Sequence, residues 1–356
     1  MEYLQVGFEN LSSSFETFSL SSPGSGSPPK WQYGKERPKF DLEGNLELGE
    51  MINSDGLRLT TYFWPASCPH TEVRGQVIGF HGMGTHVRYE YLKHVSYEKD
   101  KDTFKATYHE PTFEDSWIHN IVDAGYNFHS FEHQSMGLSE GKNGLRGYFD
   151  EFEDLVDDAI AMCRKIMEQF QGPIFLIGPS LGGCIAARVV QELDFIDGCI
   201  LLAPMLSLEQ LKQDRMNQLL LPIAGCLQSI APTLRLASEA ENNMFPQESE
   251  YLRNDILCDH TTVRLRVGWE CLIGVENARN AVEKITCPIL IFHSSNDTMV
   301  DPEGSEFFFN NCNSTEKEYV VLDSGISWHA LILEPEGDVI LKQSLEWMDS
   351  FSTAVV

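Results

Sequence analysis

The stretch that decides the fold reads Pro173-Ile174-Phe175-Leu176-Ile177-Gly178-Pro179-Ser180-Leu181-Gly182-Gly183-Cys184-Ile185-Ala186-Ala187-Arg188-Val189-Val190. Its first five residues form a short apolar run typical of a buried strand, and a helical pattern starts at the serine. Between them lies the motif G-x-S-x-G, in which small neighbours let a helix and a strand approach closely around a strained turn. We therefore predict that Ser180 projects at the carboxyl end of a strand, with a helix N-terminus beneath it.

The same motif occurs a second time, at Gly137-Leu138-Ser139-Glu140-Gly141. The nearest strand-like run before Ser139 ends at Phe131, and no helix pattern follows directly. Context therefore favours Ser180. The alternative for Ser180 is a purely structural role, because serine often caps a helix.

Strand-like runs alternate with helical patterns through most of the chain. Two β-type runs flank the turn Asn53–Gly56 and predict a hairpin, whereas most later runs are continuous, as buried parallel strands are. This alternation predicts an α/β fold with a mostly parallel, eight-stranded sheet flanked by helices. The runs are Leu46–Ile52, Leu57–Trp64, Val77–Phe80, Tyr126–Phe131, Ile174–Ile177, Cys199–Leu202, Ile289–Phe292 and Glu318–Leu322.

The chain divides into a tail, a core in two parts and an insertion. Residues 1–38 include a stretch rich in Ser, Gly and Pro and are predicted to be a disordered tail. Residues 207–278 show helical patterns without a convincing strand and include the apolar run Leu219–Ile223, which predicts a helical cap. Residues 39–206 and 279–356 are the two parts of the predicted α/β core.

A serine becomes a good nucleophile when a base takes its proton and an acid holds that base in one tautomer. After a serine of this strand–turn–helix kind, the acid and then the histidine follow along the chain. Asp297 follows the run that ends at Phe292, and His329 follows the run that ends at Leu322. Both are expected in loops at the carboxyl edge of the sheet, so Ser180, Asp297 and His329 are predicted to form a catalytic triad.

The acid and the base each have an alternative candidate in the sequence. Asp301 could replace Asp297 as the acid, but it lies further from the strand end, and we expect it to brace the loop. His293 could be the base only if the chain order were abandoned.

Two backbone N–H groups are needed to stabilise the negative charge that develops on a carbonyl oxygen under attack. One is expected from Leu181, directly after the serine. The second is expected from the loop His81-Gly82-Met83-Gly84 after the first buried parallel strand, with Met83 as the donor.

With these motifs assembled, the sequence resembles the monoacylglycerol lipase and lysophospholipase family of serine α/β-hydrolases, from about Leu46 to the C-terminus. The resemblance implies the α/β-hydrolase fold, cleavage of single-chain lipid esters under a hydrophobic cap, and no metal or organic cofactor. His86-Val87-Arg88, Ser116-Trp117 and Gly144–Gly147 are similar to lysophospholipase-like hydrolases of protists. The further matching segments are His81–Gly84, Met136–Gly141, Gly178–Gly183, Asn254-Asp255, Ser295–Asp297 and Trp328-His329.

The chain departs from the family pattern in two places. The family usually has Asp-x-x-Gly-His-Gly before its Ser-Glu-Gly, whereas Ser135 and Met136 stand here in the run Glu132–Gly137. This difference bears on substrate preference more than on catalysis. Pro179, before the serine, is also less usual there.

The composition argues against nucleic acid and anionic membranes as partners, and it indicates a cellular compartment. The formal charge of −27 and the lack of a basic stripe argue against nucleic acid and against anionic membranes. Nine cysteines without a C-x-x-C pair indicate free thiols and a reducing compartment, and Glu2 stands where a signal peptide needs positive charge. We expect a cytoplasmic protein with no obligate protein partner and, at most, transient peripheral membrane contact through the cap.

The function expected from these motifs is hydrolysis of carboxylic esters of monoacylglycerol or lysophospholipid through an acyl-enzyme on Ser180. Three alternatives stay open. A general esterase of short acyl chains or an acyltransferase could use the same residues. A ligand-binding protein could retain the fold without catalysis.

Overall fold

The computed structural model describes residues 43–100, 103–210, 224–235, 242, 244–259 and 262–352. The predicted tail at residues 1–38 and the apolar cap run Leu219–Ile223 lie outside these residues. Within the described part of the chain, no helix has the length and apolar character needed to cross a membrane.

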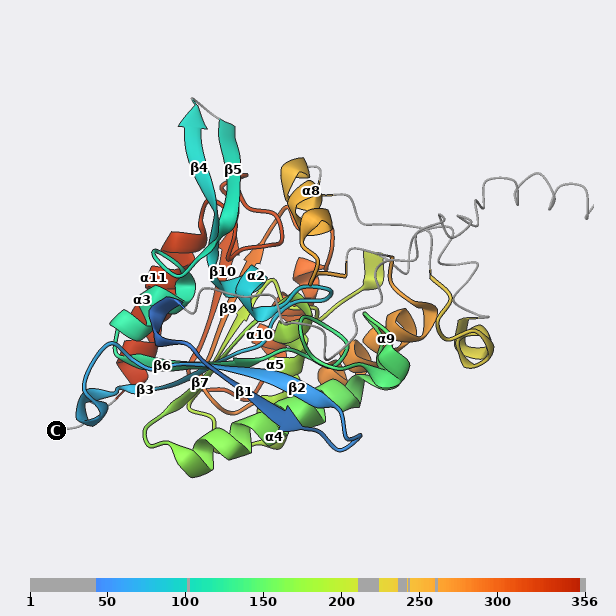
Figure 1. Cartoon of the computed structure of the whole chain (residues 1–356), viewed down its shortest axis with the longest axis horizontal. Helices are drawn as coiled ribbons and strands as arrows, with labels where there is room; N and C mark the ends of the chain where they lie inside the picture. The colour runs from blue at the N-terminus through green and yellow to red at the C-terminus, as the bar shows by residue number, and fades with distance from the viewer. Residues whose placement is uncertain are drawn as a thin grey trace, which may run out of the picture.

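One eight-stranded sheet runs through the centre of the molecule (Figure 1). β2 pairs antiparallel with β1 and β6, and all other neighbours are parallel. All eight predicted strand runs are found in this sheet, so the predicted fold class is confirmed. In spatial order the strands are β1 (Glu47–Ile52), β2 (Arg58–Trp64), β6 (Tyr126–Phe131), β3 (Gly75–Gly79), β7 (Ile174–Pro179), β8 (Gly198–Leu202), β9 (Ile289–Ser294) and β10 (Lys317–Leu322).

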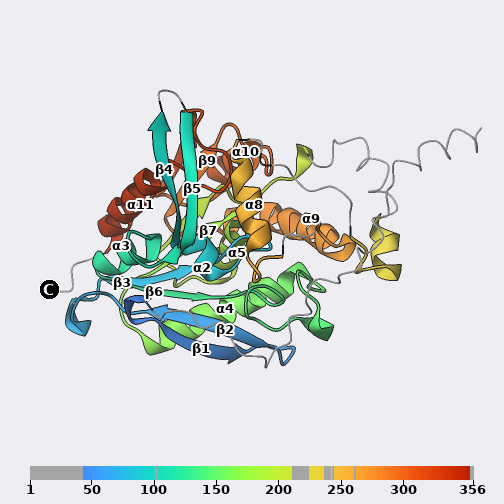
Figure 2. The same cartoon turned by 45° about the horizontal axis from the view of Figure 1, so that its top comes forward.

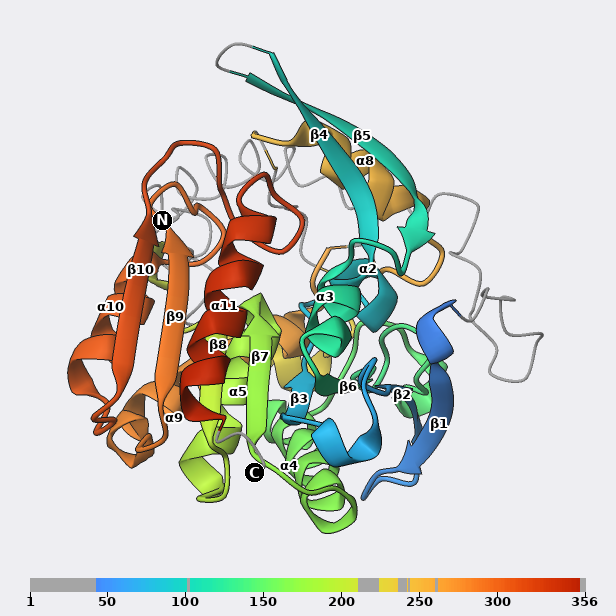
Figure 3. The same cartoon turned by 90° about the vertical axis from the view of Figure 1, so that its left-hand side faces the viewer.

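Helices cover both faces of the sheet (Figure 3). One face carries α3 (Trp117–Asp123) and α11 (Gly337–Phe351). The other carries α4 (Phe152–Gln169), α5 (Ser180–Glu192), α9 (Leu265–Asn280) and α10 (Pro302–Asn311). The remaining helical elements are α2 (Val87–Tyr91), α8 (Pro246–Asn254) and 3-10 turns at Glu43–Asn45, His70–Glu72, Lys142–Gly144 and Val282–Lys284.

The sequence pattern of the elements matches the side that each one buries. β6, β7, β8 and β9 are buried at every position, because helices cover both of their faces. In α4 the predicted apolar stripe faces the core, where Phe152, Leu155, Ala159, Cys163 and Ile166 are at most 2 % exposed.

A second, two-stranded sheet was not predicted. β4 (Lys93–Asp100) and β5 (Thr103–Thr112) form a hairpin that projects beside α8 (Figure 2). Its apolar side chains alternate with many charged ones, so the run lacks the continuous apolar character of the central strands. The inner face packs on α8, with Tyr97 5.9 Å from Phe245 and Tyr108 5.0 Å from Tyr251 between ring centroids.

The segment between β8 and β9 contains both α8 and α9. α9 packs against α4 and α5, and a Cβ at Gly274 would lie 2.4 Å from the ring of Phe152. α9 is thus part of the helical layer over the core. The limits predicted for the cap, residues 207–278, stay a prediction.

We predict that Gly182→Ala destabilises the fold. A Cβ at this position would lie 2.5 Å from the carbonyl oxygen of Phe80 and 2.8 Å from that of His81, and both belong to the backbone. The expected loss is about 1–3 kcal/mol in the free energy of unfolding, measured with urea.

Gly225→Ala is the control, because its added Cβ meets only the ring of Trp269, at 3.1 Å. It should change the free energy of unfolding by less than about 1 kcal/mol. Equal stability of the two variants would contradict the tight approach of α5 to β3.

Candidate active site

Ser180 is the first residue of α5 and directly follows β7. Its φ of 48° lies in the left-handed region, which costs a residue with a side chain about 1–2 kcal/mol. Gly178 relieves crowding at this turn, because a Cβ there would lie 2.3 Å from the carbonyl oxygen of Gly182. The turn holds Ser180 in a strained, half-buried position at the carboxyl end of the strand.

The structure brings Ser180, His329 and Asp297 into one hydrogen-bonded line. His329 Nε2 lies 3.0 Å from Ser180 Oγ, and His329 Nδ1 lies 2.7 Å from Asp297 Oδ2. Because a carboxylate accepts hydrogen bonds, Nδ1 carries the proton and Nε2 is free to accept the serine proton. This is the geometry that a general base and its nucleophile require.

Asp297 is held by four hydrogen bonds. Oδ1 accepts the N–H groups of Met299 and Val300 at 2.8 and 3.0 Å, and Oδ2 faces both His329 and His293. Burial favours the neutral acid, but the histidines and their hydrogen bonds outweigh burial and lower the pKa of Asp297. Asp297 is therefore ionised at neutral pH.

His293 and Asp301, the alternatives for the base and the acid, form hydrogen bonds with other residues around the site. His293 is fully buried, with Nε2 3.2 Å from Asp297 Oδ2 and Nδ1 2.7 Å from Ser305 Oγ. The carboxylate of Asp301 accepts the hydroxyl of Ser207 at 2.7 Å and the amide of Gln210 at 3.3 Å. Asp301 thus ties the loop after β9 to the chain after β8.

The pKa of His329 reflects opposing effects. Burial lowers it, whereas the carboxylate of Asp297, 2.7 Å away, raises it more, and Glu334 and Glu248 act in the same direction. The net result is a pKa above the ordinary value for histidine. The imidazole therefore needs a higher pH to be neutral than a solvated histidine does.

The loop with Met83 lies beside Ser180. A Cβ at Gly82 would be 3.9 Å from Ser180 Cβ. Met83 is half-buried and packs against the core, and Leu181 is fully buried in the first turn of α5. The role of these two amides as oxyanion donors stays a prediction.

Two buried carboxylates near the site were missed by sequence reasoning. Glu90 Oε2 accepts the N–H of Gly82 at 3.1 Å and the hydroxyl of Thr85 at 2.9 Å, which fixes the loop of Met83. Glu334 accepts backbone N–H groups from the loop of His329. Glu90 lies in the short helix α2 and Glu334 in a loop, and a single acid in either place has no sequence pattern that distinguishes it from a solvated one.

The segment that departs from the family pattern is buried. Ser135, where the family has Gly, adopts a φ of 68°, and Met136 is 1 % exposed. Glu132 is fully buried and accepts the Tyr62 hydroxyl at 2.7 Å and the N–H of Leu138. Both departures are therefore buried, and Ser135 adopts the positive φ that a glycine adopts more easily.

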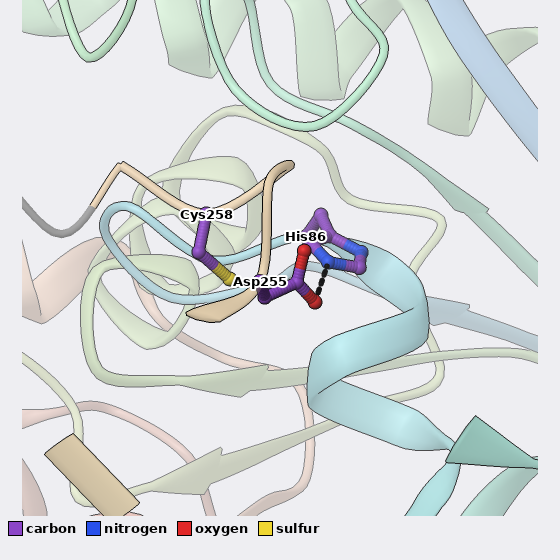
Figure 4. A group of neighbouring side chains, drawn as sticks. All are labelled: His86, Asp255 and Cys258. Atoms are coloured by element: carbon purple, nitrogen blue, oxygen red, sulfur yellow. Dashed lines mark hydrogen bonds and ion pairs between the residues drawn. The ribbon is translucent and has the colours of Figure 1, made fainter. Parts of the chain in front are cut away.

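His86, Asp255 and Cys258 form the one group of metal-type donors found among the described residues (Figure 4). His86 Nδ1 accepts the N–H of Tyr89, so Nε2 carries the proton and donates to Asp255 Oδ2 at 3.0 Å. Asp255 Oδ1 accepts the N–H of Leu257, and burial raises the pKa of the Cys258 thiol. A metal needs free lone pairs and a thiolate, so this donor set fits a hydrogen-bonded pair better than a metal site.

A family model and several known proteins are similar to this chain. A family model described as serine aminopeptidase, S33, matches residues 107–336. The monoglyceride lipase of Saccharomyces cerevisiae is 23 % identical over 85 % of this chain and 93 % of its own length. A phospholipase of Bacillus subtilis is 28 % identical over 58 % of this chain and 79 % of its own length.

A solved structure has the same fold. The structure of a soluble variant of the yeast monoglyceride lipase with a substrate analogue has a TM-score of 0.68 and 21 % identity. The match covers 89 % of this chain and all of that chain.

We predict that the reactivity of Ser180 toward a fluorophosphonate falls as the pH falls. Only neutral His329 can accept the serine proton, and its pKa is raised, so the midpoint of the fall should lie above pH 6.5. The measurement is the labelling rate against pH.

Asp297→Asn provides the matched comparison. Loss of the negative charge should lower the pKa of His329, move the midpoint to lower pH, and slow labelling by about a thousandfold or more. An unchanged midpoint would show that Asp297 does not act on His329.

Proposed function

The chain belongs to the serine aminopeptidase S33 family of α/β-hydrolases, and we propose that it hydrolyses carboxylic esters of single-chain lipids through an acyl-enzyme on Ser180. The observation that carries this proposal is the line from Ser180 through His329 to Asp297, with hydrogen bonds of 3.0 and 2.7 Å. The strained turn at Ser180 supports it, because strain of this kind gathers at reactive positions.

The proposed reaction has two halves. His329 takes the proton of Ser180 while Oγ attacks the ester carbonyl, and the amides of Met83 and Leu181 stabilise the oxyanion. The C–O bond to the alcohol breaks, and His329 returns the proton to the alcohol. Water then attacks the acyl-enzyme with His329 as base, which releases the carboxylic acid and restores Ser180.

The lipid part of the proposal rests on the similarity to a monoglyceride lipase and a phospholipase. A cavity lies near the loop of His329, but neither the triad nor the two predicted oxyanion amides line it. It has a volume of about 330 Å³ and lies between β4 and the chain after His329. This volume is at the lower end of small-molecule sites, roughly 300–1,000 Å³. Its lining is mixed: apolar side chains such as Leu92, Val95 and Ile332 alternate with charged and polar ones, Lys93, His94, Ser96, Asp115, Ser116, Glu334 and Asp338.

Partners and compartment are also part of the proposal. The charge of −27 would weaken binding to anionic lipid surfaces, so we infer that any membrane contact is peripheral and transient. All nine cysteines are free, and most are buried, which fits the reducing cytoplasm.

We predict that Ser180→Ala abolishes labelling by a fluorophosphonate. The probe forms a bond to the nucleophilic oxygen, and the alanine variant lacks this oxygen. Ser139→Ala is the matched control, since it changes the serine of the second motif. Labelling that persists in Ser180→Ala, with a folded protein, would refute the assignment of the nucleophile.

We predict that long-chain monoacylglycerol or lysophosphatidylcholine has a higher kcat/KM than a short acetyl ester. A long acyl chain buries more apolar surface, at about 25 cal/mol per Å². The measurement is a chain-length series with products identified, together with an aminoacyl anilide as a peptidase substrate.

The outcomes separate the alternatives. Preference for the acetyl ester indicates a general esterase, and cleavage of the anilide alone indicates a peptidase. Products with an added acyl group on glycerol or on lysolipid indicate an acyltransferase.

A further inference from the structure

The loop that carries His329 is fixed by one buried carboxylate. Glu334 Oε2 accepts the backbone N–H of Trp328 at 2.7 Å, and Oε1 accepts those of His329 and Ala330, both at 2.8 Å. Glu334 is 4 % exposed. Three consecutive amides, centred on His329, thus converge on a single side chain.

The chain forms a turn that brings this carboxylate back onto its own loop. The N–H groups of Leu333 and Glu334 both donate to the carbonyl of Ala330, at 2.8 and 3.2 Å. Hydrogen bonds to an ionised acceptor are about twice as strong as neutral ones. The three hydrogen bonds to the amides of residues 328–330 are therefore strongest when Glu334 is ionised.

We propose that Glu334 is a positioning residue for His329 and fixes the backbone so that Nε2 meets Ser180 Oγ and Nδ1 meets Asp297. It acts through the amides of residues 328–330 and not by contact with the reacting atoms. The inference rests on the proposed function, because that function makes His329 the base.

When Glu334 is ionised, its charge acts in the same sense as its geometry. Burial lowers the pKa of His329, and Glu334 is one of the carboxylates that raise it, so Glu334 also favours the imidazolium formed during catalysis. Burial raises the pKa of Glu334 to about 7, while the three amides favour its ionised form.

The test compares two isosteric changes in the same loop. Glu334→Gln keeps the size but replaces one acceptor oxygen by an NH2 group, which cannot accept an N–H. Glu336→Gln is the matched control, because Glu336 Oε2 accepts two side-chain hydroxyls, those of Ser324 and Ser327, at 2.8 and 2.6 Å, and no backbone N–H of the described residues.

Steady-state hydrolysis of an activated ester should separate the two variants. Glu334→Gln is expected to lower kcat about tenfold or more and to change KM less than about twofold, because the base is misplaced while the binding surface stays. Glu336→Gln should keep kcat within about threefold of the parent. Equal kcat values for the two variants would overturn the proposal.

A second measurement needs no turnover. The proton between His329 Nδ1 and Asp297 should give a low-field ¹H NMR signal in the parent and in Glu336→Gln, and the signal should broaden or vanish in Glu334→Gln. If the parent cleaves no ester, the proposed function fails, while this signal still tests the role of Glu334. An unchanged signal in Glu334→Gln overturns that role.

Glu334→Asp covers the case in which Glu334→Gln does not fold. Aspartate keeps the charge but is shorter by one methylene, so it should lower kcat while leaving KM nearly unchanged. A folded Glu334→Asp variant with the kcat of the parent would contradict the proposal.

Discussion

The site depends on how closely the start of α5 approaches the ends of β3 and β7. Side chains at Gly178 and Gly182 would overlap the backbone carbonyls of Gly182 and Phe80. Their absence lets the chain turn sharply enough to hold Ser180 at a positive φ. Such a turn persists only when its surroundings over-determine it, and the sheet with its two helical layers provides that constraint.

Buried carboxylates fix the loops around this turn. Glu90 accepts the amide of Gly82, Asp297 accepts those of Met299 and Val300, and Glu334 accepts those of the loop around His329. Asp301 likewise accepts the amide of Gln210, in the chain after β8. A buried charge is costly unless it is hydrogen-bonded, and these amides meet that need. Part of the acidic composition therefore serves the interior and not only solubility.

The sheet could be predicted from the sequence because most of its strands are continuous apolar runs and the first two flank a turn. The position of Ser180 could be predicted because a strand and a helix flank its motif. The convergence of Asp297 and His329 on Ser180 followed from chain order and strand ends. The hairpin β4–β5 was missed, since its stability comes from rings such as Tyr97 resting on a distant helix. Glu334 was missed for a similar reason, because its partners are backbone amides, which leave no trace in side-chain patterns.

The hairpin β4–β5 has a mechanical consequence. Its rings rest on α8, a helix that lies more than a hundred residues further along the chain. The hydroxyl of Tyr251 also donates to the carbonyl of His109, at 2.9 Å. Neither the hairpin nor α8 can move outward alone without breaking these ring contacts and this hydrogen bond. The movements of the two elements are therefore coupled. Widening of this side of the molecule must be a concerted displacement of both rather than the opening of a single flap.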